Sequence, residues 1–473
     1  MRPRPALLPS AWILAVLAGC GAAEGQGPPE GSAPRPNVVL ILVDDLGWTD
    51  VACYGSRAYR TPRIDELARR GVRLTNAYAS NPMCKASRYA LMTGRYAARK
   101  RSNAPDPGAE PVDETTVAEV FRDEGYATFF AGKWHIEKRR STPRTYGFDT
   151  QVGVHKKGEP ATYFFPYGEE GDPKKVPLEE GGEPGEYLTD RLTDEALAFI
   201  DAHAEQPFFV CLSHYAVHKP LEAKAELVAA YERILADTDH EGPAVVRVGK
   251  ALQKQRQDDP VYAAMVHSVD ESVGRVLDAL DEHDLTDRTI VLFTSDNGGD
   301  SCNTTAGERS STSNVPLKAG KFWLYEGGIR VPLVVAYPPT VSAGGTADAV
   351  VTGTDHYPTL LELAGLEPRP RDHVDGVSYA PVLRAEADWT RPAAFWHFPI
   401  DGSLAAWVGT EPGSAIREGD YKLIEWYESG TIELYDLADD VGEERDLGSA
   451  EPERARALLD RLRRWRAEVD APL

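Results

Sequence analysis

Four groups of side chains that can bind ions or transfer protons follow short apolar runs in this sequence. The groups are Asp44 and Asp45 after residues 38–43, Lys133 and His135 after 127–132, His214 and His218 after 207–213, and Asp296 and Asn297 after 289–294. Carboxylate and amide oxygens are the ligands that hard divalent cations such as Ca²⁺ and Mg²⁺ prefer. Two groups therefore offer an all-oxygen cation site, and the other two offer anion binding and proton transfer. Taken singly, each group is also ordinary strand-end or turn sequence.

The apolar runs predict how these groups meet. VVLILV (38–43) and TIVLFT (289–294) are continuous rather than alternating, which is typical of strands buried on both faces of a parallel sheet. Helical patterns, such as the one over 261–282, separate the runs. In sheets built by this alternation, ligands bind at the carboxyl ends of the strands. We therefore predict an α/β fold with a mostly parallel central sheet sandwiched by helices, and convergence of the four polar groups.

The C-terminal part of the chain has a different pattern. The 473 residues are too many for one ordinary hydrophobic core. After about residue 370, short strand-like segments with glycine turns replace the alternation, and an amphipathic helix closes the chain. We predict a main domain over 37–370 and a smaller C-terminal α+β subdomain of antiparallel strands over 371–473. A polar, helical insertion is expected at 221–260.

The N-terminus and the charge bear on location and partners. Residues 1–20 combine a basic start, an apolar run too short to span a membrane, and the sequence LAGC ending at Cys20. LAGC resembles the bacterial lipoprotein box, which implies cleavage before Cys20, lipidation of its sulfur, and a flexible tether over 21–36. A plain secretory signal is the alternative. Either way we expect an exported, periplasmic or cell-surface protein that uses the export and lipoprotein-processing machinery, and the net charge of −22 argues against nucleic acid as a partner.

A lone cysteine stands at the start of a predicted helix in NPMCKASRYALMTGRY (81–96). A free cysteine usually packs as a small apolar side chain. Cys84, however, precedes a helix that we expect to end at Gly94, and at a helix N-terminus the dipole and Arg88 favour an anion. The position is therefore also suited to a reactive thiolate.

Segments along most of the chain resemble the type I sulfatase family of the alkaline phosphatase superfamily. CKASRYALMTGRY resembles the signature C-x-(P/A)-x-R followed by TGR, with Ala86 where proline is commoner. The further segments, in the order of the family, are NVVLILVDDLGWTDVACYGS, TPRIDELARRGVRLTNAYA, AGKWHIE, SHYAVHKPL, LFTSDNGG, KAGKFWLYEGGIRVPLVV and ELYDLADDVGEERDL. The resemblance covers residues 37 to about 450. It implies an arylsulfatase-like hydrolase with an alkaline phosphatase/sulfatase-like fold.

The resemblance also implies a mechanism and a set of site residues. Cys84 would be oxidised by a formylglycine-generating enzyme to formylglycine (3-oxoalanine), whose hydrate attacks the sulfur of a sulfate ester. The covalent sulfo-enzyme then collapses to the aldehyde and releases sulfate. The resemblance implies Ca²⁺ binding, with Mg²⁺ less expected, by formylglycine-84 together with Asp44, Asp45, Asp296 and Asn297. Arg88 and Lys133 would stabilise the ionised hydrate, and His135 would deprotonate its second hydroxyl. His218 and Lys321 would bind the sulfate and assist the leaving group.

Several alternatives stay open from the sequence. Lys318 competes with Lys321 for the role before the YEGG stretch. His155 and Lys156, in GVHKKGEP, are candidates for contact with a sulfated sugar, although a run of charges is usually a solvated face. The expected substrate is a sulfated carbohydrate or an aryl sulfate. The rival functions are a phosphatase or phosphonate monoester hydrolase on the same scaffold, and a non-catalytic protein that binds sulfated glycans and keeps Cys84 as a thiol.

Overall fold

The computed structural model describes most of the chain after residue 34. The described ranges are 35–99, 114–136, 142–178, 182–238, 242–304, 310–386, 389–400 and 402–471. They belong to one compact unit that begins at Arg35. The predicted signal peptide, Cys20 and all of the predicted tether except residues 35–36 lie outside the described residues.

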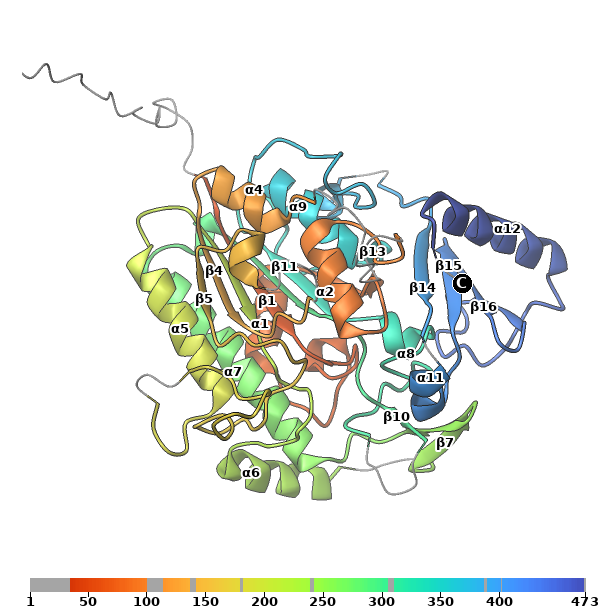
Figure 1. Ribbon diagram of the computed structural model, residues 1–473, viewed down its shortest axis with the longest axis horizontal. Helices are drawn as coiled ribbons and strands as arrows, with labels where there is room; N and C mark the ends of the chain where they lie inside the picture. The colour runs from red at the N-terminus through yellow and green to blue at the C-terminus, as the bar shows by residue number, and fades with distance from the viewer. Residues whose placement is uncertain are drawn as a thin grey trace, which may run out of the picture. The chain divides into compact units, whose positions relative to one another are not determined.

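A central eight-stranded sheet organises the unit (Figure 1). In spatial order its strands are β12 (Gly345–Ala347), β2 (Val72–Leu74), β11 (Leu333–Ala336), β9 (Thr289–Ser295), β1 (Asn37–Val43), β6 (Phe208–Ser213), β4 (Ala127–Gly132) and β5 (Thr150–Val152). All neighbouring pairs are parallel except the two that β11 makes, with β9 and with β2. The prediction of a mostly parallel central sheet is confirmed.

Side chains of the central strands pack into cores on both faces of this sheet. In β1, Val39 and Ile41 belong to one core, and Val38 and Leu40 to the other. The first core is covered by α1 (Pro62–Arg70), α5 (Leu188–Ala202) and α7 (Pro260–Glu282), and the second by α2 (Cys84–Thr93), α4 (Val117–Asp123) and α9 (His356–Leu363). Burial on both faces explains why the strands read as continuous apolar runs.

A separate four-stranded antiparallel sheet follows in the C-terminal part, as the sequence predicts. Its strands are β14 (Ala394–Phe398), β15 (Gly413–Glu418), β16 (Tyr421–Trp426) and β17 (Ile432–Asp436). The closing helix α12 (Pro452–Glu468) packs Leu462 and Trp465 against apolar side chains of this sheet. The domain boundary at 370/371 stays a prediction.

The expectation of a helical insertion at 221–260 is wrong for its second half. Helix α6 (Ala225–Ala236) is followed by a hairpin of β7 (Val245–Val248) and β8 (Ala251–Lys254), which pairs with β10 (Cys302–Asn303). The segment VVRV is rich in β-branched residues, and Gly249 supplies the positive φ (+55°) that the tight turn needs.

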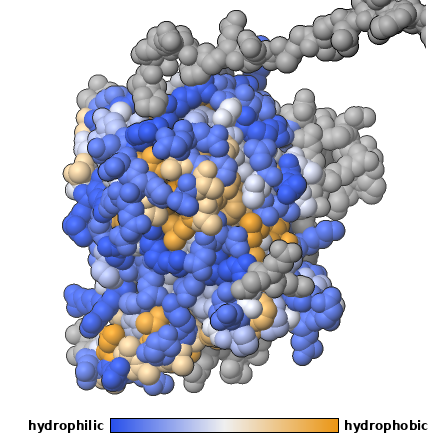
Figure 2. Space-filling view, turned by 90° about the vertical axis from the view of Figure 1, so that its left-hand side faces the viewer, coloured by the Kyte–Doolittle hydropathy of each residue, from blue (hydrophilic) through white to orange (hydrophobic). Residues whose placement is uncertain are grey.

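The remaining elements are short. They are β3 (Ala77–Tyr78), β13 (Val351–Thr352), α8 (Glu326–Ile329), α10 (Ala380–Leu383), α11 (Gly402–Val408) and the 3₁₀ turns Ala52–Tyr54, Pro143–Tyr146, Thr286–Arg288 and Gly353–Asp355. No helix in the described ranges combines the length and apolarity that crossing a bilayer requires. Figure 2 shows that the face on the α5 side is largely hydrophilic, with its apolar side chains in separate patches.

Candidate active site

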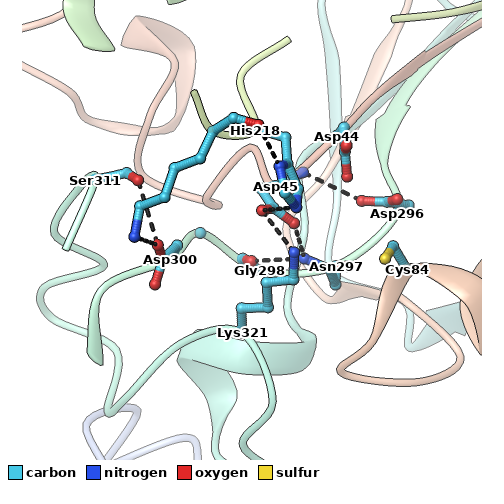
Figure 3. A network of polar contacts seen from close by, with 12 residues as sticks. Asp44, Asp45, Cys84, His218, Asp296, Asn297, Gly298, Asp300, Ser311 and Lys321 are labelled. Atoms are coloured by element: carbon cyan, nitrogen blue, oxygen red, sulfur yellow. Dashed lines mark hydrogen bonds and ion pairs between the residues drawn. The ribbon is translucent and has the colours of Figure 1, made fainter. Parts of the chain in front are cut away.

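The carboxylates predicted for cation binding meet where two adjacent strands end. Val43 of β1 pairs with Ser295 of β9, so the residues that follow each strand are neighbours. The backbone N–H of Asp45 donates to Asp296 Oδ1 at 3.2 Å, and Asn297 Nδ2 donates to Asp45 Oδ1 at 2.8 Å. Figure 3 shows these side chains grouped with Asp44. The parallel sheet thus brings together the four oxygen donors that the sequence singled out.

Cys84 joins this group from helix α2. It is the first residue of α2, which ends at Gly94 with a left-handed φ of +63°, as predicted from the sequence. The Cys84 side chain is buried, and its sulfur lies within 4.8 Å of carboxylate oxygens of Asp44 and Asp296. The sulfur is 3.3 Å from His135 Nδ1. Cys84 therefore lies between the carboxylates and a histidine.

Arg88 holds the elements around Cys84 together. One helical turn further along α2, its guanidinium Nε donates to Asp296 Oδ2 at 2.6 Å, and Nη1 donates to the carbonyl of Lys133 and to Ser213 Oγ at 2.6 and 2.7 Å. Its side chain is only 2% exposed. Arg88 thus links α2 with the ends of β4, β6 and β9.

Two buried lysines each face one aspartate. Lys133 Nζ donates to Asp44 Oδ2 at 2.5 Å, and Lys321 Nζ donates to Asp45 Oδ2 at 2.7 Å. Burial favours the neutral acid, but the charge of Lys321 and its hydrogen bond outweigh burial and hold the pKa of Asp45 below its usual range. Burial, reinforced by the neighbouring carboxylates, raises the pKa of Asp44 well above its usual range despite Lys133. The two aspartates therefore differ in how readily they ionise.

Lys318, the alternative to Lys321, lies in a different environment. Its Nζ donates to the Tyr435 hydroxyl and to the carbonyl of Glu443, and it sits 3.9 Å from the centre of the Tyr325 ring. These contacts place Lys318 against the C-terminal sheet, whereas Lys321 reaches the carboxylate group.

The two histidines of the predicted set are uncharged in this environment. Burial, with added repulsion from Lys133, lowers the pKa of His135 to about 3. Burial and Lys321 likewise lower the pKa of His218 to about 3. His218 Nδ1 lies 2.8 Å from the carbonyl of Lys219, which can only accept, so Nδ1 carries the proton and Nε2 faces Asp45 Oδ2 at 3.6 Å. Both imidazoles are therefore able to accept a proton.

Two site residues have backbones in the left-handed region that non-glycine residues seldom adopt. Asp45 has φ +61° and His135 has φ +51°. Such conformations persist where the surrounding structure enforces them, and they cluster at functional sites. Here the two residues are Asp45, one of the grouped carboxylates, and His135, which contacts Cys84.

The donor set fits a hard cation. Asp44 Oδ1 and Asn297 Oδ1 are buried, and neither has a hydrogen-bond partner among the described residues. Leaving a buried oxygen without a partner costs roughly 1–3 kcal/mol, which a cation bound to both atoms would offset. The chemistry of the set, three carboxylates and one amide, is that of a Ca²⁺ or Mg²⁺ site.

Of the other predicted residues, His155 is half-buried and within reach of the charge of Lys133, and Lys156 is exposed. The His155 ring stacks on Tyr215 with the ring centres 5.2 Å apart, and its Nδ1 accepts the backbone N–H of Lys157 at 3.1 Å. Burial lowers the pKa of His155 to about 4. His214, which we interpret from the sequence as structural, is buried against Ser272, 3.0 Å from its Oγ, and is not part of the site.

Sequence reasoning missed two residues that position the site. Ser213, the last residue of β6, accepts from Arg88 and donates to the carbonyl of Lys133. Gly158 lies so close to His135 that a Cβ built on it would be 2.5 Å from the ring. Ser213 ends an apolar run directly before His214, which was an available signal. Nothing in the sequence marks Gly158.

Comparison with known proteins decides the family. Residues 36–366 match the family model of the sulfatases. The chain belongs to the sulfatase family. Residues 319–467 also match the model for the C-terminal part of N-sulphoglucosamine sulphohydrolase. As a sulfatase, the protein is a sulfuric ester hydrolase, and the sequence resemblance is confirmed.

Its relatives cover most of the chain. A sulfatase of Formosa agariphila is 31% identical over 93% of this chain and 90% of its own. Human N-acetylgalactosamine-6-sulfatase is 30% identical over 80% of this chain and 71% of its own. The crystal structure of Ps i-CgsB in complex with k-i-k-neocarrahexaose has a TM-score of 0.74 and 30% identity, covering 91% of this sulfatase and 93% of that chain.

Proposed function

We propose that this sulfatase is exported and hydrolyses sulfate esters of a carbohydrate, using formylglycine made from Cys84 and a bound Ca²⁺. The observation that carries the proposal is the position of Cys84. Its sulfur lies within 4.8 Å of two buried carboxylates and 3.3 Å from His135, with Arg88 one turn along the same helix. A cysteine that only packed in a core would not need this group of charged residues around it.

Calcium would be held by Asp44, Asp45, Asp296 and Asn297. The buried oxygens of Asp44 and Asn297 that lack partners support this assignment. When bound, the ion supplies positive charge that orients the sulfuryl oxygens and stabilises charge on them.

The surrounding side chains divide the remaining work. Arg88 and Lys133 would stabilise the ionised hydroxyl of the formylglycine hydrate. Lys321, charged and buried, would bind a sulfate oxygen, since Asp45 raises the pKa of its amine against the effect of burial. His218 would bind the sulfate beside Lys321 and deliver a proton to the departing alcohol, because a bound anion raises the pKa of an adjacent imidazole. His135, neutral and in contact with residue 84, would accept the proton of the second hydroxyl.

A carbohydrate sulfate is the favoured substrate class. The relatives include an N-acetylgalactosamine-6-sulfatase and a protein crystallised with a neocarrahexaose. His155 and the exposed Lys156 would contact sugar substituents outside the sulfate pocket. Export, with lipid on Cys20, fits a polysaccharide substrate that meets the enzyme outside the cytoplasm.

Two measurements test the proposed chemistry, and a third tests the lipid anchor. The first is a mass spectrum of the tryptic peptide 74–85 from protein made in its native host, where formylglycine replaces the sulfur and two hydrogens of Cys84 with oxygen. The second is release of sulfate from sulfated sugars and aryl sulfates, compared with turnover of a phosphate diester and a phosphonate monoester. An intact Cys84 thiol in active protein contradicts the nucleophile, and faster phosphonate or phosphate turnover favours the rival hydrolase. Retention of the Cys20→Ser variant in membranes would contradict the lipid anchor.

A further inference from the structure

One exposed tryptophan stands next to the candidate active site. Trp407, on α11, is 54% exposed, and the other exposed large apolar side chains of the described ranges are all valines. A single exposed apolar residue is common on protein surfaces and needs no explanation by itself. The location of Trp407 is what distinguishes it.

A row of aromatic rings connects Trp407 to the catalytic lysine. The Trp407 ring meets the Phe322 ring edge-on at 6.1 Å, and Phe322 directly follows Lys321 in the chain. The backbone N–H of Phe322 donates to the carbonyl of Pro82 at 2.8 Å, two residues before Cys84. Phe322 is thus fixed between Lys321 and the Cys84 segment, and Trp407 is the next ring outward.

The indole is held on an anchored helix. Thr304 Oγ1 donates to the carbonyl of Trp407 at 2.5 Å. Gly409 packs so closely on Thr304 that an added Cβ would lie 2.5 Å from its methyl group. Ala405 and Val408 on the same helix are buried. In Figure 1, α11 lies beside β10 and below α8. An exposed ring whose backbone is already fixed loses little conformational entropy when a ligand covers it.

We propose that the Trp407 indole stacks against a sugar ring of the substrate, the unit next to the one that carries the scissile sulfate. This inference rests on the proposed carbohydrate sulfatase function. The sulfate would lie at Lys321, the sulfated unit would pass over Phe322, and the neighbouring unit would lie on Trp407. The C–H face of a sugar ring is apolar and matches the flat indole, whereas its hydroxyls stay in water. A single indole is far smaller than the roughly 800 Å² that a protein partner covers, so a saccharide is the occupant that the geometry favours.

The test measures binding and turnover in parallel. The probes are two matched pairs, galactose 4-sulfate with a neocarrabiose 4-sulfate, and N-acetylgalactosamine 6-sulfate with a chondroitin 6-sulfate disaccharide. Calorimetric Kd values are measured on protein that retains the Cys84 thiol, so that no turnover intervenes, and kcat/KM is measured on matured protein. The variants are Trp407→Ala, Trp407→Leu, which keeps an apolar contact with Phe322, and Trp407→Phe, which keeps an aromatic face.

We expect Trp407→Ala and Trp407→Leu to lower the preference for disaccharide over monosaccharide on the order of tenfold, and Trp407→Phe to keep most of it. An equal loss on both members of a pair, or equal behaviour of the leucine and phenylalanine variants, overturns the stacking site. So does a wild type that binds none of the disaccharides. If the disaccharides bind and the tryptophan variants weaken that binding, but no sulfate ester is turned over, the stacking site stands and the proposed function fails.

Discussion

Replacing Arg88 with methionine tests the charge balance of the site in the folded protein. The substitution keeps most of the side-chain volume but removes a guanidinium that is 2% exposed and bonded to the fully buried carboxylate of Asp296. The carbonyl of Lys133 loses one donor but keeps another, because Ser213 Oγ also donates to it. The main consequence is therefore an unpaired buried carboxylate.

The expected loss follows from these contacts. Removing one partner of a buried ion pair costs about 3–5 kcal/mol. The lost bond to Ser213 adds about 1 kcal/mol at most, because the Ser213 hydroxyl keeps its bond to the Lys133 carbonyl. We expect Arg88→Met to lower the free energy of unfolding by about 4 kcal/mol in a calcium-free buffer. The matched control is Arg70→Met, which removes a partly exposed pair with Asp281 and Glu66 and is expected to cost less than about 1 kcal/mol.

Urea unfolding in EDTA measures the loss of stability, and urea unfolding with excess Ca²⁺ measures how much the ion stabilises each protein. Calcium at the proposed site would compensate the charge of Asp296, so its stabilising effect should be larger in Arg88→Met than in the wild type. A loss no greater than that of Arg70→Met would refute the assignment of Asp296 and Arg88 as a buried charged pair. An equal calcium effect in variant and wild type would refute the placement of the ion beside Asp296.

Three further changes probe the ligands, the histidine and the C-terminal sheet. Asp296→Asn removes a charged oxygen ligand and should weaken Ca²⁺ binding, measured by calorimetry, by about tenfold or more. Unchanged metal content would contradict the ligand set. Gly158→Ala introduces a Cβ 2.5 Å from the His135 ring and should lower kcat by tenfold or more, on the order of what a displaced catalytic group costs, with a small change in KM. Lys422→Met removes a cation shared by two buried carboxylates, Glu443 at 2.8 Å and Glu326 at 2.9 Å. Because Glu326 keeps its pair with Arg330 and the Glu443 carboxylate has no other cation in contact among the described residues, the change should cost about 3–5 kcal/mol at pH 8.

The last two changes, Gly158→Ala and Lys422→Met, each have a control. Gly402→Ala adds a methyl where nothing lies within 4 Å, so its kcat should stay close to that of the wild type. Burial raises the pKa of Glu443 to about 7, so the folded protein takes up a proton there as the pH falls through 7. The deficit of Lys422→Met should therefore be smaller at pH 5.5 than at pH 8, and a deficit that does not change with pH would rule out Glu443 as its cause.

Local chemistry in the sequence predicted the fold and the strand-end part of the site. Continuous apolar runs implied parallel strands. Parallel strands bring Asp45 and Asp296 to the same edge of the sheet, whatever the conformation of the connecting loops. The hairpin at 245–254 was missed because strands of four residues are too short to show a clear period, and they form only by pairing, β7 with β8 and β8 with β10. Gly158 was missed because its role is a distance to another segment, His135, which no local pattern records.

The charges around Cys84 explain how an acidic protein can bind an anion. Among the described residues of the site, three buried carboxylates face three buried cations, and both histidines are uncharged. The carboxylates are those of Asp44, Asp45 and Asp296, and the cations are Arg88, Lys133 and Lys321. With all three carboxylates ionised, as cation binding requires, the site would be close to neutral by itself, and a bound divalent cation would leave an excess of two positive charges in a region of low dielectric. That excess would be local, so it would attract a sulfate group even though the whole chain carries a formal charge of −22. Removing the cation should consequently weaken substrate binding as well as stability, because the lysines then stay paired with the carboxylates and are not available to bind the sulfate.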